Sequence, residues 1–442
     1  MISNSNNRNS KIIIFISFLV LLISFKSSNQ WSDFPIGNDF FWWLVQIVFF
    51  VLVFKLNRSY STRLIQKNYF LIKLYVSWNI ICMVRGAFVA ENYWEWKFLI
   101  ATSLFLLLPL LAYTATNATS IQIIVKTWFK YGLFIYLLFS PFIWGDGVGK
   151  FLIPISFLLL FFSILNWKWK IIAVLVSVFV ITFDITARSN VLKFAIPLLI
   201  GNLYYFRKIL SVKILNLSRL LLLFLPFVFF FMGVSGIFNV FKMDEYLGED
   251  YIVSSNSKSG AFAEESLTTD SRTLLYEEVL GSAVRNVYVL FGRTPARGND
   301  SASFGETTSL TLNTGKMERF SNEVSILNIF TWLGLMGVVL YFLIFFRATY
   351  LAINQSNNFF MKLIGLNISF RWAYGWVEDF SNFDLSNIFL WIMIGICFSE
   401  SFRKMTNQEF RLWIRGIFEK SKPLSRKNRY NPITYNKAVT TQ

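Results

Sequence analysis

The sequence predicts an all-α polytopic membrane protein with about twelve transmembrane helices and one large, partly helical loop outside the membrane. Of its 442 residues, 55% are hydrophobic and only 15% are charged, whereas a soluble chain carries about 25% charged residues. The apolar residues also occur in blocks of about 15 to 22, the length that a bilayer-spanning helix needs. These observations exclude a soluble enzyme, a secreted disulfide scaffold and a protein with a single membrane anchor.

Twelve apolar blocks are predicted to be the spans. In chain order they are 12–25, 40–56, 69–84, 98–113, 124–144, 151–166, 170–184, 190–206, 218–236, 324–346, 359–376 and 384–399. The first block is short, but no small-residue cleavage site follows it, so it is predicted to be a spanning helix and not a removed signal peptide. The third contains Lys73 and precedes Arg85, the fifth contains Lys126 and Lys130, and polar residues interrupt the eleventh.

Lysine and arginine concentrate in alternate connections between these blocks, at 55–67, 168–170 and 207–219, and again at 403–437. Because such residues collect in cytoplasmic loops, both termini are predicted to be cytoplasmic and the number of spans to be even. The predicted organisation is helices 1–9 in residues 1–236, the large outside loop in 237–323, helices 10–12 in 324–399, and a basic cytoplasmic tail in 400–442. The tail is expected to rest against anionic lipid headgroups.

The large loop differs in composition from the rest of the chain. From Phe238 to Glu323 it holds thirteen acidic and eight basic residues and is rich in Ser, Thr and Gly. Loops of this length are usually functional or disordered. Its middle predicts a helix, because apolar residues recur at helical spacing from 274 to 280, between Asp270 as N-cap and Gly281. A partly folded outside domain is therefore expected.

Arginines on the outside are the candidate binding residues. They are Arg188 after the seventh span, Arg272, Arg285, Arg293, Arg297 and Arg319 in the large loop, and Arg371 near the outer end of the eleventh span. Guanidinium binds two phosphate oxygens at once and stays charged, so it is the donor best matched to phosphate. The alternative is that the loop arginines pair with the carboxylates of their own loop. Arg188, in a very short loop with one acidic neighbour, fits that alternative less well.

A carboxylate is the candidate general base, because the chain contains no histidine. Glu323 stands at the start of the tenth span, where partial burial would make it a stronger base. The alternative is an interfacial carboxylate near the positive end of the helix dipole. The two cysteines, Cys82 and Cys397, lie in apolar blocks and indicate neither disulfides nor thiol chemistry. With no histidine ligand and no paired acidic motif, neither a metal nor a cofactor is expected.

Short motifs add to this layout. They are Ala187-Arg188-Ser189 outside a mid-chain span, Arg272 followed by a predicted helix and Leu290-Phe291-Gly292, and the stretch Glu323–Gly337 with its Gly-x-x-Gly end. In these motifs and in its layout the chain resembles the Wzy-type O-antigen polymerases, which share a superfamily with the O-antigen ligases. In the ligases a His-Asn pair precedes the Gly-x-x-Gly. Here Glu323 and Val324 take those positions, which puts the ligase assignment in doubt.

The resemblance implies a metal-independent glycosyltransferase of the bacterial inner membrane, with the large loop in the periplasm. A growing glycan would be transferred from undecaprenyl diphosphate to the non-reducing end of an incoming lipid-linked repeat unit. Glu323 would accept the proton of the acceptor hydroxyl. The diphosphate and glycan would be bound by Arg188, Arg272, Arg293, Arg297, Arg319 and Arg371. Expected partners are the undecaprenyl-diphosphate-linked oligosaccharide and membrane lipids. The resemblance also admits a chain-length regulator protein. No nucleic acid is expected as a partner, because the distribution of the net charge of +17 along the chain argues against it.

Three other functions stay open on the sequence alone. An O-antigen ligase would transfer the glycan to the lipid A core. A flippase or transporter of lipid-linked oligosaccharides would carry charges deep in several helices and lack a large loop. The in-span charges here are few, chiefly Lys73 and Lys193, which favours the enzyme. A structural or receptor protein would tolerate substitution of the loop arginines.

Overall fold

The computed structural model describes residues 2–60, 69–183, 188–242, 252–256, 262–266 and 272–418, and these residues are predominantly helical. All twelve predicted apolar blocks fall on helices. The membrane-domain helices before the large loop are α1 (Ile2–Ser28), α2 (Asp39–Tyr60), α4 (Phe70–Val89), α5 (Tyr93–Leu106), the 3-10 helix η2 (Leu108–Thr116), α6 (Ala118–Phe139), α7 (Gly147–Leu159), α8 (Trp167–Phe183), α9 (Arg188–Asn202) and α10 (Val212–Val234). After the loop come α14 (Ser325–Asn354), α15 (Phe359–Tyr374), α16 (Leu385–Phe398), α17 (Glu400–Lys404) and α18 (Asn407–Phe418).

Seven helical segments in the described residues are long and apolar enough to cross a membrane, fewer than the predicted twelve. They are Asn9–Trp31, Asp39–Ser59, Phe70–Val89, Tyr93–Thr116, Ala118–Phe142, Val212–Val234 and Ser325–Asn354. The other five blocks form helices of 13 to 17 residues. Two of these contain an internal proline, Pro154 in α7 and Pro197 in α9, and proline removes a helical hydrogen bond.

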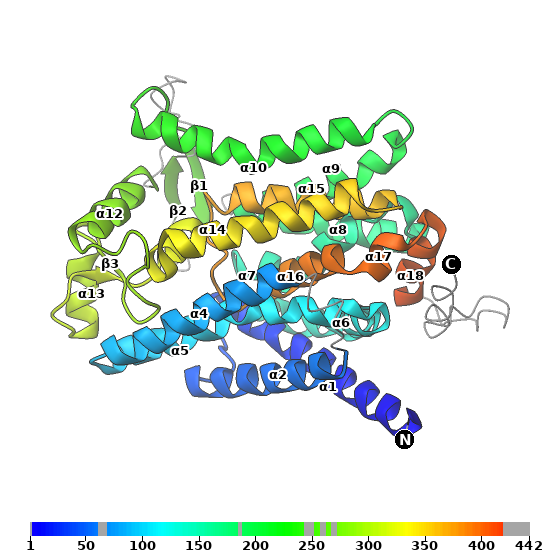
Figure 1. Ribbon diagram of the computed structural model, residues 1–442, viewed down its shortest axis with the longest axis horizontal. Helices are drawn as coiled ribbons and strands as arrows, with labels where there is room; N and C mark the ends of the chain where they lie inside the picture. The colour runs from blue at the N-terminus through cyan, green and yellow to red at the C-terminus, as the bar shows by residue number, and fades with distance from the viewer. Residues whose placement is uncertain are drawn as a thin grey trace, which may run out of the picture.

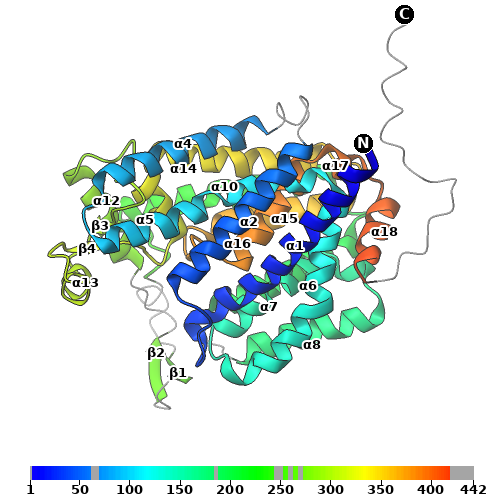
Figure 2. The same ribbon diagram turned by 90° about the horizontal axis from the view of Figure 1, so that it is seen from below.

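The helices run side by side along the long axis of the molecule (Figure 1). One end, here called the loop end, carries α12 (Arg272–Arg285), β3 (Asn299–Asp300) and α13 (Gly305–Leu312). The opposite, terminal end carries the start of α1 and the last described helix, α18; Figure 2 shows the same separation from a second direction. Both ends of the described chain therefore lie far from the large loop.

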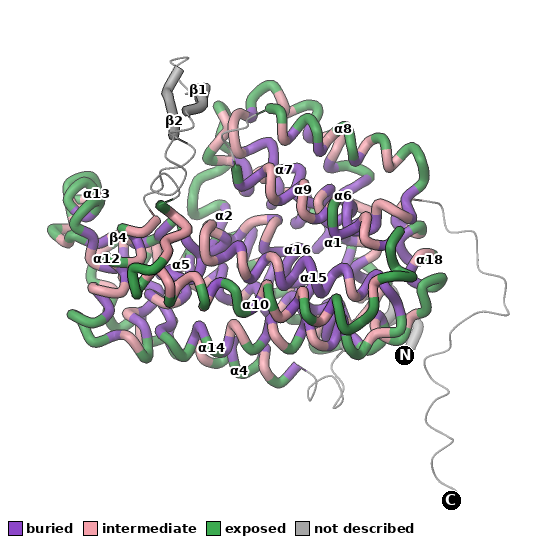
Figure 3. The backbone as a smooth tube through the Cα atoms, turned by 90° about the horizontal axis from the view of Figure 1, so that it is seen from above, coloured by how far each residue is buried: buried purple, intermediate pink, exposed green. Residues whose placement is uncertain are grey.

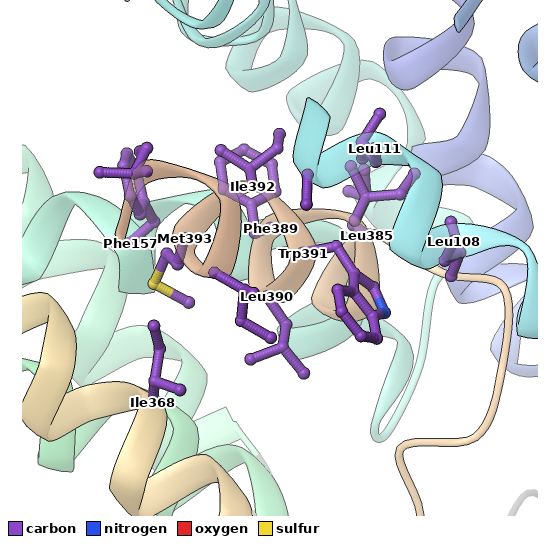
Figure 4. Close-up of a cluster of buried hydrophobic side chains, with 14 of the residues drawn as sticks. Leu108, Leu111, Phe157, Ile368, Leu385, Phe389, Leu390, Trp391, Ile392 and Met393 are labelled. Atoms are coloured by element: carbon purple, nitrogen blue, oxygen red, sulfur yellow. The ribbon is translucent and has the colours of Figure 1, made fainter. Parts of the chain in front are cut away.

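Apolar side chains fill the centre of the bundle and also cover much of its outside. Helix α16 is buried along almost its whole length (Figure 3). Its side chains pack against Leu108 and Leu111 of η2, Phe157 of α7 and Ile368 of α15 (Figure 4). A helix that is apolar all round belongs inside a bundle. Large apolar side chains such as Leu175 on α8 and Phe231 on α10 are exposed, and a bilayer would solvate such surfaces. The chain is a helical membrane protein.

The large loop contains the predicted helix and two small sheets. Helix α12 confirms the prediction of a helix over 274–281 and continues to Arg285, while the predicted N-cap, Asp270, lies outside the described residues. Strands β1 (Ile252–Asn256) and β2 (Phe262–Ser266) pair antiparallel. Strand β3 pairs with β4 (Glu318–Arg319), so that Asn299 faces Arg319.

A break in α14 joins the loop to the membrane bundle. At Gly334 the backbone leaves the helix with φ 69° and ψ −172°, a conformation essentially restricted to glycine. The backbone N–H of Leu335 donates to the Val289 carbonyl at 2.8 Å instead of to Thr331. The Thr331 carbonyl accepts from the Arg293 N–H at 2.7 Å. The loop segment 289–293 thus supplies the hydrogen-bond partners that the break removes.

The two backbones meet at a pair of glycines. A Cβ atom on Gly334 would lie 2.3 Å from the Gly292 nitrogen, and Gly292 itself has a positive φ of 70°. Helix α4 reinforces the junction, because Arg85 Nη1 donates to the Phe291 carbonyl at 2.8 Å and Trp78 Nε1 donates to the Leu333 carbonyl at 3.0 Å. The Phe-Gly motif of the loop and the first glycine of the Gly-x-x-Gly motif are therefore in direct contact.

We expect Gly334→Val to lower the free energy of unfolding by about 4 kcal/mol or more, because it adds a steric clash to backbone strain. Gly315→Val is the matched control, since Gly315 also has a positive φ of 66° but has nothing within 4 Å of the added Cβ. It should cost about 1–2 kcal/mol. Thermal unfolding of the detergent-purified protein, followed by tryptophan fluorescence, measures both. Equal losses of stability would contradict the interlocked backbones.

Candidate functional site

The predicted arginines do not converge on one site. Arg188 begins α9 and is exposed. Arg272 begins α12, and its Nη2 lies 3.3 Å from Glu378 Oε2 in the connection that follows α15. Arg371 lies in the last turn of α15 and is buried. Only Arg272 and Arg371 adjoin the cavity described below.

Two loop arginines form ion pairs with the loop's own carboxylates. Arg293 Nη1 lies 2.6 Å from Asp300 Oδ1, and its Nη2 lies 3.0 Å from Glu318 Oε1. Arg297 donates two hydrogen bonds to Glu318, from Nε to Oε2 at 2.9 Å and from Nη2 to Oε1. Burial alone would raise the pKa of Asp300, but the hydrogen bonds from Arg293 and Asn286 and the charges of Arg293 and Arg285 together outweigh it, so the pKa lies below its ordinary value. For these arginines the structure therefore matches the alternative of pairing within the loop.

This network also ties the loop to helix α5. Glu95 in the first turn of α5 is fully buried, and its Oε1 accepts from Lys316 Nζ at 2.6 Å. Lys316 binds Glu91 as well, at 2.7 Å, and Arg297 Nε lies 3.9 Å from Glu95. Buried ion pairs of this kind fix one arrangement of the chain, because loss of either partner leaves an uncompensated charge.

Glu323, the predicted catalytic base, is not desolvated. Its side chain is 60% exposed and contacts Arg319 Nη2 at 3.2 Å. Arg319 in turn stacks on Phe304, with its Cζ atom 4.1 Å from the ring centre. The expected partial burial of Glu323 is wrong, because α14 begins only at Ser325 and leaves the carboxylate on the surface.

A small polar cavity lies inside the loop end of the bundle, between α7, α9, α15 and the connection to α16. Its volume is about 70 Å³, and its polar lining consists of Lys150, Lys193, Glu378, Asp379, Asn382, Asp384 and Ser386. A neighbouring space shares Ile153, Lys193 and Ser386 with it and reaches Arg371. Four elements distant in sequence thus bring three cations and three carboxylates together.

The cations are held by an aromatic ring and hydroxyl groups. Lys193 is 6% exposed; its Nζ donates to Ser189 Oγ at 2.9 Å and lies 5.3 Å from the Phe380 ring centre. Arg371 Cζ lies 3.8 Å from the same ring, and its Nη2 donates to Ser386 Oγ at 2.9 Å. Within the described residues, Lys150, Lys193 and Arg371 form no salt bridge. The carboxylates of the cavity wall oppose these cations only from beyond salt-bridge distance, so an anion that enters the cavity would be the direct partner of Lys193 and Arg371.

Two of the three carboxylates have structural tasks. Asp379 accepts hydrogen bonds from the backbone and hydroxyl groups of Ser381 and, at 2.8 Å, from Asn382 Nδ2. Asp384 is the N-cap of α16 and accepts from the Asn387 N–H at 2.8 Å. Both oxygens of Asp379 and Oδ1 of Asp384 are thus engaged within the chain, and these bonds hold the shape of the connection.

Glu378 is the carboxylate suited to proton transfer. Burial raises the pKa of Glu378 above its ordinary value of 4.5, although Lys193 and Arg272 act in the opposite direction. A raised pKa brings a carboxylate closer to the basicity that general base catalysis at neutral pH requires. Its ion pair with Arg272 also fixes one side-chain position. Glu378 therefore has the properties that the sequence had suggested for Glu323.

Sequence reasoning did not assign Glu378, Lys150 or Phe380 to a site, and it noted Lys193 only as a charge within a span. One signal was present: Glu378-Asp379 follows the eleventh span directly in a short connection. The described residues contain no group of three or more acidic or cysteine side chains placed to hold a metal ion. The chain matches no protein-family profile, no curated protein and no solved structure.

We expect Glu318→Gln to destabilise the protein by about 3–5 kcal/mol, because it removes the shared partner of Arg293 and Arg297 from a buried site. Glu323→Gln, the same change at an exposed ion pair, should cost less than about 1 kcal/mol. Thermal unfolding in detergent and protease cleavage within residues 299–319 measure the two effects. Equal stability of both variants would contradict the anchoring role of the network.

Proposed function

We propose that this chain is an integral-membrane glycosyltransferase that polymerises surface polysaccharide from lipid-linked repeat units, as an O-antigen or capsule polymerase does. The observation that carries the proposal is the polar cavity at the loop end. There Lys150, Lys193 and Arg371 stand without salt-bridge partners among the described residues, beside the basic carboxylate Glu378. The resemblance to the Wzy-type polymerases adds the reaction class.

In the proposed reaction, the acceptor is a sugar hydroxyl at the non-reducing end of a lipid-linked repeat unit. Glu378 takes the hydroxyl proton as the oxygen attacks the anomeric carbon of the growing glycan. The bond between that carbon and the diphosphate oxygen of the lipid carrier breaks, and the bonding electrons leave with the diphosphate. The products are the lengthened glycan on its new carrier, a protonated Glu378 and undecaprenyl diphosphate.

The cations would stabilise the leaving group. Negative charge grows on the diphosphate as the glycosidic bond breaks, and preorganised donors in a site that excludes water stabilise it strongly. Lys193 and Arg371 are both buried and share the Phe380 ring, so their charges are fixed in place before the substrate arrives. Arg272 acts as a positioning residue because it holds Glu378.

The other predicted arginines take different roles in this proposal. Arg293, Arg297 and Arg319 shape the loop that covers the site. Arg188, exposed at the start of α9, is retained as a contact for the diphosphate or the glycan outside the cavity. Glu323 is replaced by Glu378 as the proposed base.

The proposal includes a topology with twelve spans in the bacterial inner membrane, the large loop in the periplasm and both termini in the cytoplasm. Two observations support it. The start of α1 and helix α18 lie at the same end of the bundle, opposite the loop (Figure 1). The five shorter helices, each of 13 to 17 residues, lie beside the longer ones and can complete the crossing with their flanking segments.

The flippase alternative has one observation in its favour, because Lys193 and Arg371 are buried on helices inside the bundle. The ligase alternative uses the same superfamily chemistry with a different acceptor. A gel of the cellular lipopolysaccharide, together with analysis of the lipid-linked intermediates, separates all three functions, since each leaves a different product when it is lost.

We expect Glu378→Gln to reduce polymerisation by about 10²–10⁴-fold, because it removes the base without changing the side-chain shape. Cells would then carry only lipopolysaccharide core with a single repeat unit. Lys193→Gln should reduce polymerisation by about 10²–10³-fold, the cost of losing one charge-stabilising donor. Glu323→Gln is the matched control and should leave the ladder unchanged. Membrane levels of every variant are compared by immunoblot.

The alternative outcomes are distinct. Loss of all capped core, with long polymer accumulating on undecaprenyl diphosphate, would identify a ligase. Accumulation of single repeat units on the cytoplasmic side would identify a flippase. An unchanged ladder in Glu378→Gln cells would refute the assignment of the site.

We also expect a pH dependence of the purified enzyme in liposomes. Glu378 must be ionised to accept a proton, and its pKa is raised by burial, so the rate should fall with decreasing pH through a midpoint above 4.5. The Glu323→Gln variant should keep this acidic limb. An acidic limb with its midpoint at or below 4.5 would argue against Glu378 as the base.

A further inference from the structure

A second, apolar cavity of about 440 Å³ lies at the loop end beside the polar one. We call it the apolar groove. Its walls are the last turns of α10 with Phe229 and Gly233, the following segment with Phe241, helix α12 with Tyr276 and Leu280, and the end of α15 with Trp376. Its volume falls within the range of about 300–1,000 Å³ typical of small-molecule sites.

Glu277 is the one charged side chain in the walls, and several of the uncharged polar groups are hydrogen-bonded within the walls. Asn239 Nδ2 donates to Thr273 Oγ1 at 3.0 Å, and the Tyr276 hydroxyl donates to the Trp376 carbonyl at 2.7 Å. Aromatic rings of Phe230 and Phe241 pack against Tyr276. The surface that remains for a ligand is therefore predominantly hydrocarbon, and it suits a chain without hydrogen-bonding groups.

The groove and the polar cavity share a wall. Trp376 and Val377 line the groove, and the next residue, Glu378, lines the polar cavity. On the facing element, Thr273 lines the groove, while its neighbour Arg272 binds Glu378. The Arg272–Glu378 ion pair thus stands at the boundary between an apolar site and a cation-rich site.

The outer rim of the groove faces the apolar surface of the bundle. On α10, Val228, Phe231 and Val234 are 51%, 66% and 68% exposed. A hydrocarbon chain could pass from the bilayer over this rim without crossing a charged surface. A ligand that fills both sites is then an amphiphile with an apolar chain and an anionic head.

We propose that the apolar groove binds the polyprenyl chain of a polyprenyl diphosphate lipid, whose diphosphate lies in the polar cavity next to it. The inference rests on the proposed function, because it names the site for the lipid part of the same substrate. Lys193 and Arg371 have no carboxylate within salt-bridge distance among the described residues, so the polar cavity favours a lipid with a diphosphate over a neutral lipid. The groove sets the depth at which the diphosphate meets Glu378 and Lys193.

The test uses the purified full-length protein and undecaprenyl diphosphate that carries a photoreactive diazirine on its chain and no sugar. Cross-linked peptides are mapped by mass spectrometry. We expect labelling on residues 225–241 and 273–280. Gly233→Trp, which fills the groove from α10, should reduce it about tenfold. Ala373→Leu fills the groove from the opposite wall with a smaller side chain and should also reduce labelling.

Leu221→Trp is the matched control, because Leu221 is exposed on α10 away from the groove and its rim, and this variant should label as the unmodified protein does. Unchanged labelling in both groove-filling variants would overturn the inference. Equal labelling by a phosphatidylglycerol with the same diazirine would also overturn it, since the groove would then hold ordinary lipid.

The result is separable from that of the proposed function. Glu378→Gln should retain labelling while it loses polymerisation. Groove labelling together with an unchanged ladder in Glu378→Gln cells would refute the catalytic assignment and leave the lipid site standing. Loss of the ladder in Glu378→Gln cells, without groove labelling of the unmodified protein, would refute the lipid site and leave the catalytic assignment standing.

Discussion

The arrangement of the loop end depends on the exchange of backbone hydrogen bonds between broken helix α14 and the segment 289–293. A helix interrupted inside a membrane protein leaves polar backbone groups that lipid cannot satisfy. Here the interruption at Gly334 is tolerated because Val289, Leu290 and Arg293 provide the partners. The exchange fixes the large loop against the bundle, and it requires glycine on both sides of the contact.

The ion pairs of the loop extend this attachment from α14 to α5. Since Asp300 and Glu318 together neutralise Arg293 and Arg297, and Glu95 pairs with Lys316, these loop cations are compensated within the protein. Charge available for a ligand lies deeper, in helices α7, α9 and α15. The loop arginines that are most conspicuous in the sequence thus anchor the loop, while less conspicuous charges line the cavity.

Buried cations without salt-bridge partners are costly in a membrane bundle. Lys193 and Arg371 are tolerated because the Phe380 ring and two serine hydroxyls contact them, yet these contacts compensate the charges only in part. The apolar groove lies next to them across Trp376–Glu378. Buried cations next to a hydrocarbon surface suit an amphiphile with an anionic head and an apolar chain.

Composition and periodicity alone determined the helical membrane class, the positions of the helices and the helix within the large loop, because these depend on local hydrophobicity over ten to twenty residues. The contrast between Glu323 and Glu378 was decided only by tertiary structure. Both glutamates lie beside a predicted span, but a helix that starts two residues later leaves one exposed, whereas packing of α9 and α12 buries the other. Tertiary structure likewise decided that Arg293 and Arg297 both pair with Glu318. It also brought Lys193 of α9 and Arg371 of α15 to the same Phe380 ring. Charge neutralisation depends on which side chains meet, and a single sequence does not contain that information in its local pattern.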